Sequence, residues 1–201
     1  MDDEYDNRKH NNNPEHNSDP NITIENSNGN KKSYNEYILV GSSGIHRHGV
    51  FAKKDIPKGT RIAEYVGIKV PKEIGTMIET ETFNRYKDDK ENHAATYMFE
   101  IDENWDLDGD IPDNDPKYIN HSCDPNCEVD IIEGRIWIDS IKDIKKGEEI
   151  TYNYGFEISE KNPHDFKHHP CKCGSKNCVG YILAEDEWPK MKELLAKQQS
   201  E

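Results

Sequence analysis

The sequence predicts a mainly β domain with short helices, and three observations support that prediction. Short runs rich in Val, Ile and Tyr recur along the chain, each bounded by Gly, Pro, Asn or Asp, as expected of strands joined by turns. Only two stretches show the apolar spacing that is typical of a helix. The length of 201 residues suits one domain, or at most two, with room for a real core.

The composition is polar and acidic. Hydrophobic residues make up 32% of the chain, charged residues make up 33%, and the formal net charge is −14 at pH 7. No basic block of five or more residues is present, which argues against direct nucleic-acid binding. An acidic surface instead favours basic partners. Because no stretch approaches 18 consecutive apolar residues, no membrane span is expected.

Residues 1–34 are predicted to form a disordered tail. The segment is rich in Asn, Asp, His and Ser and holds few apolar side chains. Such a segment cannot bury enough surface to offset the entropy lost on ordering. The folded part is therefore expected to begin at about residue 35, with a first strand over 37–40.

A glycine-rich loop, GSSGIHRHGVFA at 41–52, follows the first strand. Glycines permit tight turns and a close approach of the backbone to a ligand, although a plain turn explains the same pattern. Strands are predicted over 50–52 and 61–66, and the Pro and Gly of 55–59 place a turn between them.

The middle of the chain combines one helix with a strand and a turn. A helix is predicted over 72–90, directly after a proline, where proline is tolerated. Its loose apolar stripe consists of Ile74, Met77, Ile78 and Phe83. Alternation and composition predict a strand over 96–101, and the acidic DLDGD run at 106–110 is interpreted as a turn.

The stretch KYINHSCDPNC at 117–127 carries the densest set of chemically active side chains. Asn and His donate and accept hydrogen bonds at fixed angles, and cysteines are zinc ligands as thiolates. Its Asp-Pro-Asn triplet is typical of a turn. A polar hairpin turn with buried cysteines is the plain alternative to a functional site.

The last third of the chain returns to strands and then ends in a helix. A hairpin is predicted over 128–139, with Glu133 and Gly134 at its tip. A strand over 149–154 and a polar loop over 155–170 follow. From Glu185 the chain reads as an amphipathic helix that packs on the domain, with partner binding as the alternative. Its apolar face consists of Trp188, Met191, Leu194 and Leu195.

Five cysteines, three of them in CKCGSKNC at 171–178, indicate metal ligation. The sequence starts without a secretory signal, so a reducing compartment is expected and disulfides are not. A structural zinc site needs four ligands, and Cys171, Cys173 and Cys178 supply three. The fourth ligand comes from a distant segment or from a nearby histidine. The candidate histidines are His164, His168 and His169.

Four separated stretches follow one another along the chain in the order GIHRHGVFA, KYINHSCDPNC, GEEITYNYG and CKCGSKNC. Together they resemble the SET-domain protein lysine methyltransferases with a post-SET zinc segment, from about Tyr37 to about Ile182. The resemblance implies the SET-domain β-fold, with knot-like threading of the C-terminal part and a small zinc-bound post-SET tail. The domains it implies are the SET domain at 35–160, the post-SET zinc segment at 161–183 and a C-terminal helix at 184–201.

The same resemblance implies two bound groups, S-adenosylmethionine and a structural Zn²⁺. It makes Cys123 the fourth zinc ligand beside the three tail cysteines and leaves Cys127 to a core role. Many members of the family carry Gly-x-Gly in the cofactor loop, whereas this chain has Arg47 at the first glycine and keeps only Gly49. The cofactor-binding residues implied are Ile45, His46, His48, Gly49, Tyr97, Asn120, His121, Tyr154, Tyr181 and Ile182.

The catalytic residues implied are tyrosines. Tyr154 matches the family tyrosine whose hydroxyl orients the methyl group and the amine, and Tyr65, Tyr97 and Tyr152 complete the walls of a lysine channel. Methyl transfer from a sulfonium needs close alignment and a neutral amine, which an apolar channel favours. Tyr152 occupies the family position that tends to hold Tyr in enzymes that stop early, so mainly monomethyl product, with some dimethyl, is expected.

The resemblance therefore predicts a protein lysine N-methyltransferase that acts on a basic protein or peptide, with a histone tail as the expected substrate. The alternative is a catalytically silent, zinc-stabilised module that binds peptides, and Arg47 is the main point in its favour. A zinc-dependent hydrolase is disfavoured, because all-thiolate zinc sites are usually closed. We expect an intracellular protein, nuclear or chromatin-associated or else cytoplasmic, that is a monomer or a weak dimer.

Overall fold

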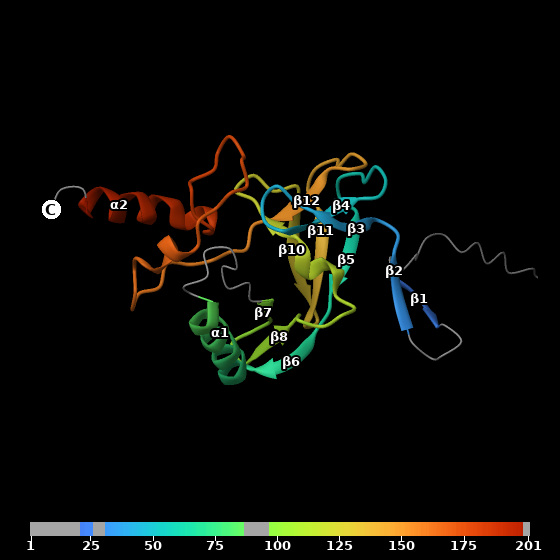
Figure 1. Cartoon of the computed structure of the whole chain (residues 1–201), viewed down its shortest axis with the longest axis horizontal. Coiled ribbons are helices and arrows are strands. Elements are labelled where there is room, and N and C mark those ends of the chain that lie inside the picture. The colour runs from blue at the N-terminus through green and yellow to red at the C-terminus, as the bar shows by residue number, and fades with distance from the viewer. Residues whose placement is uncertain (1–20, 26–30, 87–96, 199–201) are drawn as a thin grey trace, which may run out of the picture.

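The structure is a computed structural model that describes residues 21–25, 31–86 and 97–198 of the chain. Strands dominate these residues and the helices are short, which confirms the mainly β class (Figure 1). The strands are β1 (Asn21–Glu25), β2 (Lys31–Asn35), β3 (Ile38–Ser42), β4 (His48–Ala52), β5 (Arg61–Tyr65), β6 (Ile68–Pro71), β7 (Met98–Glu100), β8 (Trp105–Asp108), β9 (Asn120–His121), β10 (Cys127–Ile132), β11 (Arg135–Ser140) and β12 (Glu149–Tyr152). The helices are α1 (Lys72–Tyr86), α2 (Trp188–Gln198) and the short 3-10 turns η1 (Asp115–Tyr118), η2 (Asp165–His168) and η3 (Glu185–Glu187).

Three small sheets build the body of the domain. One has the order β3-β4-β12-β9, the second β10-β11-β5 and the third β6-β8-β7. All pairs in these sheets are antiparallel except β12 with β9, which is parallel. The predicted hairpin β10–β11 is confirmed, with Glu133 and Gly134 at positive φ angles of 52° and 73°, as a two-residue turn of type I′ requires.

The first core lies between the sheets and is rich in isoleucine. Full burial of one such side chain stabilises the fold by about 1.5–3 kcal/mol. Its least exposed members include Ile38, Val50, Ile62, Ile119, Ile138, Ile144 and Ile150. Cys127 is 1% exposed and belongs to this core, which confirms its expected role. The core includes Ile119, Ile150 and Tyr152, so it packs against β9 and β12, the two strands that carry the site.

A second core joins the cysteine-rich tail to the C-terminal helix. Ile158, Phe166, Leu183 and Met191 are buried in it. The apolar face of α2 packs there as the sequence predicted, because Trp188, Leu194 and Leu195 are in contact with the same cluster. In Figure 1, α2 lies at the opposite end of the molecule from the β1–β2 hairpin.

The tail predicted to be disordered over 1–34 contains ordered backbone in its second half. Strands β1 and β2 pair antiparallel, with Asn21 opposite Asn35, whereas residues 1–20 and 26–30 lie outside the described residues. The prediction of disorder was therefore wrong over 21–25 and 31–34. It averaged the composition of the whole segment, and so it missed the β-branched NITIE run, which favours a strand.

Two predictions in the middle of the chain need correction. The run at 106–110 is not a simple turn, because Trp105–Asp108 forms β8, the central strand of the third sheet. The carboxylate of Asp106 is buried there and accepts a hydrogen bond from Lys72 at 3.0 Å, which offsets the cost of burial. The contact with Lys72 therefore explains the buried acidic residue of this run without any bound metal ion.

Helix α1 is confirmed, but its apolar stripe is not a buried face. The helix ends at Tyr86, and residues 87–90 of the prediction lie outside the described residues. Ile74 is 42% exposed and Met77 is 57% exposed, whereas Gly75 is buried against β8. The small residue, rather than the stripe, sets the contact between α1 and the third sheet.

No helix within residues 21–25, 31–86 and 97–198 is both long and apolar enough to cross a bilayer.

Candidate active site and metal centre

The site is built where two segments far apart in the sequence lie side by side. Strand β9 pairs in parallel with β12, so that Asn120 lies opposite Thr151 and His121 lies opposite Tyr152. The backbone N–H of Ser122 continues the ladder by donating to the carbonyl of Tyr152 at 3.1 Å. The two most polar motifs of the sequence therefore meet at one edge of a sheet.

Tyr154 is held at both ends by the segment around β9. Its hydroxyl donates to the carbonyl oxygen of Ile119 at 2.9 Å, and its backbone N–H donates to Nδ1 of His121 at 3.2 Å. Burial raises the pKa of the Tyr154 phenol, and the backbone N–H of His121 offsets part of that rise. The phenol is therefore neutral at physiological pH, and its oxygen keeps one lone pair besides the one that meets the His121 N–H.

The four tyrosines that the sequence singled out do come together. The Tyr65 hydroxyl donates to the carbonyl of Tyr97 at 2.7 Å, and the rings of Tyr152 and Tyr154 lie 5.2 Å apart. Phe99 bridges the two pairs, with ring centroids 4.9 Å from Tyr65 and 6.0 Å from Tyr152. Burial raises the pKa of Tyr65 and of Tyr152, so these walls are also uncharged.

The Asn120 side chain is fully engaged in hydrogen bonds to the loop that precedes β4 and to β12, so it does not point into open space. Its side-chain amide donates to the carbonyl of His48 at 2.8 Å, to Glu149 Oε1 at 2.8 Å and to Ser43 Oγ at 3.2 Å. Ser43 in turn bonds the Glu149 carboxylate at 2.7 Å and accepts from the backbone N–H of Ile45 at 2.9 Å. Asn120, Ser43 and Glu149 thus form a polar clamp, a network of hydrogen bonds that fixes the loop with Ile45 and His46.

Local geometry explains the residues at the two glycine positions of the Gly-x-Gly pattern, Arg47 at the first and Gly49 at the second. Arg47 has a φ of 29°, in the left-handed region that favours glycine, so the backbone keeps this conformation despite the side chain. A Cβ on Gly49 would lie 2.4 Å from Glu149 Oε1 and 2.8 Å from Ser43 Cβ. Only glycine fits at the second position, because the clamp passes directly beneath it.

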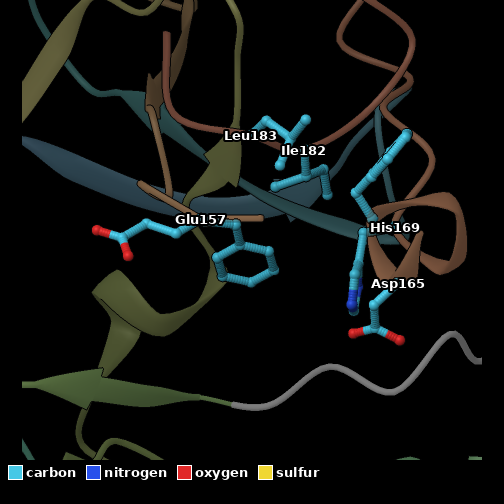
Figure 2. Close-up of a pocket in the computed structure, with 7 residues that line it drawn as sticks. Glu157, Asp165, His169, Ile182 and Leu183 are labelled. Carbon is cyan, nitrogen blue, oxygen red and sulfur yellow. The ribbon is translucent and has the colours of Figure 1, made fainter. Parts of the chain in front are cut away.

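A cavity of about 260 Å³ is lined by residues from the segment 156–183, which follows the last strand (Figure 2). Aromatic and aliphatic side chains form its walls, and carboxylates and an imidazole lie at its polar side. The lining residues are Phe156, Glu157, Asp165, Phe166, His169, Ile182 and Leu183. This mixture suits a flat aromatic ligand with polar edges, and the size approaches the lower end of small-molecule sites.

Phe156 is the contact between this cavity and the tyrosine walls. The Phe156 ring lies 5.8 Å from Tyr154 on one side and 5.4 Å from His169 on the other. Of the two tail residues that the sequence assigned to the cofactor, Ile182 lines the cavity. Tyr181 instead packs edge-on against Phe166, with centroids 4.9 Å apart, as part of the second core.

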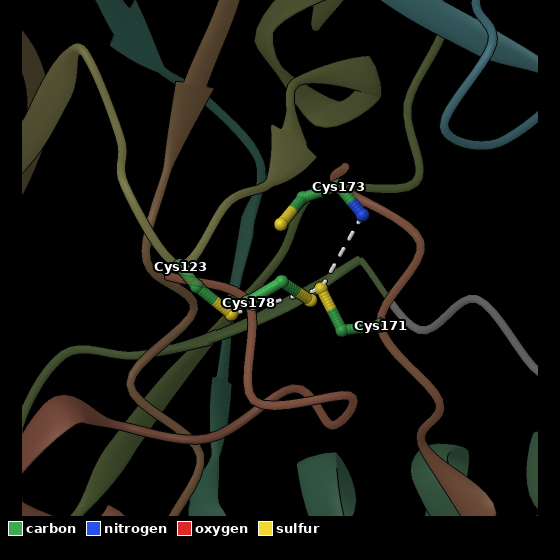
Figure 3. A group of neighbouring side chains, drawn as sticks. All are labelled: Cys123, Cys171, Cys173 and Cys178. Atoms are coloured by element: carbon green, nitrogen blue, oxygen red, sulfur yellow. Dashed lines mark hydrogen bonds between the residues drawn. The ribbon is translucent and has the colours of Figure 1, made fainter. Parts of the chain in front are cut away.

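Cys123, Cys171, Cys173 and Cys178 form one cluster whose sulfur atoms all lie within 4.8 Å of one another (Figure 3). Zinc–sulfur bonds of about 2.3 Å in a tetrahedron place neighbouring sulfurs about 3.8 Å apart. The Cys123 and Cys171 sulfurs are 3.8 Å apart, so the donor set fits a tetrahedral zinc. Among the described residues, no histidine belongs to this group of possible metal ligands. This disfavours His164, His168 and His169 as the fourth zinc ligand.

The surroundings of the cluster also suit thiolates. The backbone N–H of Cys173 points at the Cys171 sulfur, at 3.5 Å, and that of Gly180 at the Cys178 sulfur, at 3.4 Å. Burial raises the pKa of the Cys123 thiol to about 11. A positive ion is therefore needed to keep this cysteine ionised at neutral pH.

His121 stands between the cysteine cluster and the tyrosines. Its Nε2 atom lies 3.6 Å from the Cys123 sulfur, and its ring lies 5.4 Å from that of Tyr154. Burial lowers the pKa of His121 to about 4, so the ring is neutral near pH 7.

Sequence reasoning missed several residues that the structure places at the site. Phe99 and Phe156 continue the alternation that placed Tyr97 and Tyr154, and this periodic signal was available. Glu149 lies in the GEEIT motif, but nothing in the sequence predicted that it would accept from Asn120 and Ser43 across the sheet. The cavity residue Asp165 lies in η2, in a stretch without apolar periodicity, so no sequence signal identified it, and the sequence singled out His169 only as a candidate zinc ligand.

A family model described as the SET domain matches residues 47–155, which is more than half of the chain. The chain belongs to the SET domain family. The matched range of the SET domain begins at Arg47 and ends one residue after Tyr154, so it includes the second half of the loop, both tyrosine pairs and the β9–β12 pair. The cysteine-rich tail lies beyond the match.

Relatives of this SET domain are named as histone-lysine methyltransferases. The "Histone-lysine N-methyltransferase trithorax" of Drosophila melanogaster is 36% identical over 156 residues, which cover 76% of this chain and 4% of that protein. The "Histone-lysine N-methyltransferase, H3 lysine-4 specific" of Chaetomium globosum is 40% identical over 149 residues, which cover 72% of this chain and 13% of that protein. The chain therefore spans only a small part of the length of these relatives.

A solved structure also resembles this SET domain. It is a humanized mutant of the Chaetomium thermophilum Polycomb Repressive Complex 2 bound to an inhibitor, with a TM-score of 0.50 and 30% sequence identity. The similarity covers 64% of this chain and 15% of that chain.

Proposed function

We propose that this chain is an S-adenosylmethionine-dependent protein lysine N-methyltransferase that acts on a basic protein, with a histone as the substrate class. The observation that carries the proposal is the setting of the Tyr154 hydroxyl. It lies within a wall of uncharged tyrosines, beside a cavity with aromatic walls, in a family whose named relatives methylate histone lysines.

Tyr154 orients the reacting groups through its oxygen. Its proton is donated to the Ile119 carbonyl and the His121 backbone N–H takes up one lone pair, which leaves the second lone pair of the phenolic oxygen for the channel. That lone pair accepts from an N–H group of an incoming amine and favours positive charge on a nearby methyl group. Holding donor and acceptor in line supplies roughly 7–11 kcal/mol of the barrier reduction available from positioning.

Tyr65, Tyr97 and Tyr152 deliver the amine in its neutral form. A free lysine has a pKa of about 10.4 and arrives protonated. Uncharged aromatic walls desolvate the ammonium and lower its pKa, so the proton leaves to solvent before transfer. In the described residues the Tyr152 hydroxyl makes no hydrogen bond to protein, which leaves it to contact the amine or a water.

The cofactor site comprises the clamped loop and the cavity. S-Adenosylmethionine, when bound, supplies an electrophilic methyl group on a sulfonium. The loop with Ile45, His46, His48 and Gly49 brings backbone groups to one side, held by Asn120. The aromatic walls of the cavity, with Ile182, receive the adenosyl part, and the Asp165 and Glu157 carboxylates suit its hydroxyl groups.

The four-cysteine cluster holds a structural zinc that joins Cys123 to the tail. Three ligands lie within eight residues of a short polar segment that has little core of its own, so metal binding and folding of this segment are coupled. The proposed division of the chain is a SET domain at 35–160, a post-SET zinc segment at 161–183 and a C-terminal helix at 184–201. The second core packs that helix on the zinc segment.

The charge and the relatives support the choice of partner and place. A formal charge of −14 attracts a lysine-rich chain and speeds its encounter. The named relatives act on histones, which supports a nuclear or chromatin-associated setting for this chain. The knot-like threading of the fold and a monomeric or weakly dimeric state stay predictions.

Cofactor titration by calorimetry separates the enzyme from a silent module that keeps the fold. We expect S-adenosylmethionine to bind the parent protein and the His168→Asn variant alike, because His168 is exposed and lies outside both the loop and the cavity lining. Gly49→Ala should bind much more weakly, since its Cβ collides with the Glu149 clamp. Absence of binding by the folded parent protein would leave only the module.

A further inference from the structure

One buried imidazole connects the cysteine cluster to Tyr154. The His121 side chain belongs to a residue that is 3% exposed, and each of its two ring nitrogens has a partner. Nδ1 lies 3.2 Å from the backbone nitrogen of Tyr154, and Nε2 lies 3.6 Å from the Cys123 sulfur. These contacts lead from a proposed metal ligand to a proposed catalytic residue through a single ring.

The two contacts fix the tautomer of this ring. A backbone N–H is only a donor, so Nδ1 must accept from Tyr154 and carries no proton. The proton of a neutral imidazole then resides on Nε2 and points at Cys123. A zinc-bound thiolate is only an acceptor, so the donor on Nε2 matches it, and the protonated Nε2 is not itself a metal ligand.

Tyr154 depends on this ring because it lies beyond the end of the strand ladder. The last paired residue of β12 is Tyr152, opposite His121. Two residues later the Tyr154 N–H finds its acceptor in the His121 side chain, while the hydroxyl reaches back to Ile119. Without the ring, the N–H would be left without this partner in a largely apolar place, and the direction of the phenol would be less constrained.

We propose that His121 is a positioning residue that couples the zinc-bound Cys123 thiolate to the backbone of Tyr154. Zinc orients the thiolate, the thiolate holds the imidazole, and the imidazole holds the strand end from which the phenol projects. The inference rests on the proposed zinc site and the proposed methyl transfer. It adds that metal occupancy is sensed at Tyr154 through one side chain, besides ordering the tail.

Two substitutions separate the two arms of the ring. His121→Asn keeps an acceptor near the position of Nδ1 but is too short to reach Cys123. His121→Gln places a donor near the position of Nε2 and lacks the acceptor near Tyr154. His168→Asn is the matched control, because His168 is an exposed histidine of the tail outside both the cluster and the cavity lining.

The first readout is the rate of zinc release from the holoprotein to a chromophoric chelator. Loss of an outer hydrogen-bond partner weakens metal binding by about 10–100-fold. We expect His121→Asn to release zinc at least about 10-fold faster than the parent protein, and His121→Gln and His168→Asn to release it at nearly the parental rate. Equal release rates in the parent and Asn variants would overturn the Cys123 arm.

The second readout is ¹⁵N NMR of the zinc-loaded protein, and its measurement of the His121 tautomer in the parent protein needs no variant to fold. We expect His121 to show one neutral tautomer with its proton on Nε2, and the Tyr154 amide resonance to shift in His121→Gln but much less in His121→Asn. A proton on Nδ1, or loss of the zinc stoichiometry in both His121 variants as for a direct ligand, would overturn the proposal. Both readouts are independent of catalysis, so failure of methyl transfer alone would count against the proposed function and not against this link.

Discussion

Gly109 is the position where one added methyl group should do the most damage to the channel. A Cβ built there lies 2.3 Å from the Tyr65 hydroxyl and 2.4 Å and 2.6 Å from two atoms of its ring. Tyr65 is 3% exposed, and its hydroxyl is bonded to the Tyr97 carbonyl, to which the Gly109 N–H also donates at 2.9 Å. The ring therefore cannot move away from Gly109 without breaking its hydrogen bond to the Tyr97 carbonyl.

The size of the effect of Gly109→Ala follows from two costs. Overpacking a well-filled core costs about 1–3 kcal/mol, and loss of the Tyr65–Tyr97 hydrogen bond costs about 0.5–1.5 kcal/mol. We therefore expect the free energy of unfolding to fall by roughly 2–4 kcal/mol. Because Tyr65 is a proposed channel wall, the specific activity of the remaining folded protein should fall as well.

Urea denaturation of the zinc-loaded protein measures the change. Gly44→Ala is the matched control, since the same methyl group meets no atom within 4 Å there, and it should change the free energy of unfolding by less than about 0.5 kcal/mol. A Gly109→Ala variant as stable as this control would show that Tyr65 is not locked, and the account of the channel wall would fail.

Three further outcomes follow from the site. Tyr152→Phe should shift the product from mainly monomethyl towards di- and trimethyllysine, because the phenol or a water that it anchors occupies the space of the added methyl groups; an unchanged product distribution by mass spectrometry would assign Tyr152 to packing alone. Cys171→Ser should lower bound zinc from about one ion per chain towards zero by elemental analysis, with activity falling in parallel; full retention of zinc contradicts the four-cysteine site. Burial raises the folded-state pKa of Tyr65, Tyr152 and Tyr154, so the unfolded chain loses these phenolic protons at a lower pH than the folded chain does. The free energy of unfolding should therefore be constant below about pH 10 and decline above it in a series of denaturation measurements. A free energy of unfolding that stays constant up to about pH 11.5 would contradict the burial of these phenols.

Much of the strand framework followed from local sequence, because alternation and turn residues report directly on half-buried strands. The β10–β11 hairpin and the buried face of α2 are examples, with Gly134 at the turn and Met191 in the second core. The errors lie where tertiary contacts override local composition. Local composition places Asp106 in a polar turn, yet an ion pair with Lys72 stabilises it inside the third sheet.

The site followed from sequence in part, and for a definable reason. The tyrosines and the four cysteines were identifiable because their motifs carry the chemistry themselves. The parallel pairing of β9 with β12, which sets His121 between Cys123 and Tyr154, is a long-range contact without a local signal. The same holds for the clamp by which Asn120 grips the loop, since its partner Glu149 lies on another strand.

Transfer of an isotopically labelled methyl group tests the central claim most directly. The zinc-loaded chain is incubated with labelled S-adenosylmethionine and a histone mixture, and lysine residues are examined by mass spectrometry. We expect labelled methyl groups on histone lysine with the parent protein, and loss of most of this label with Tyr154→Phe, which stays folded but lacks the hydroxyl bonded to Ile119. Absence of label on any lysine from a parent protein that binds the cofactor, or an equal rate in Tyr154→Phe, would contradict the account.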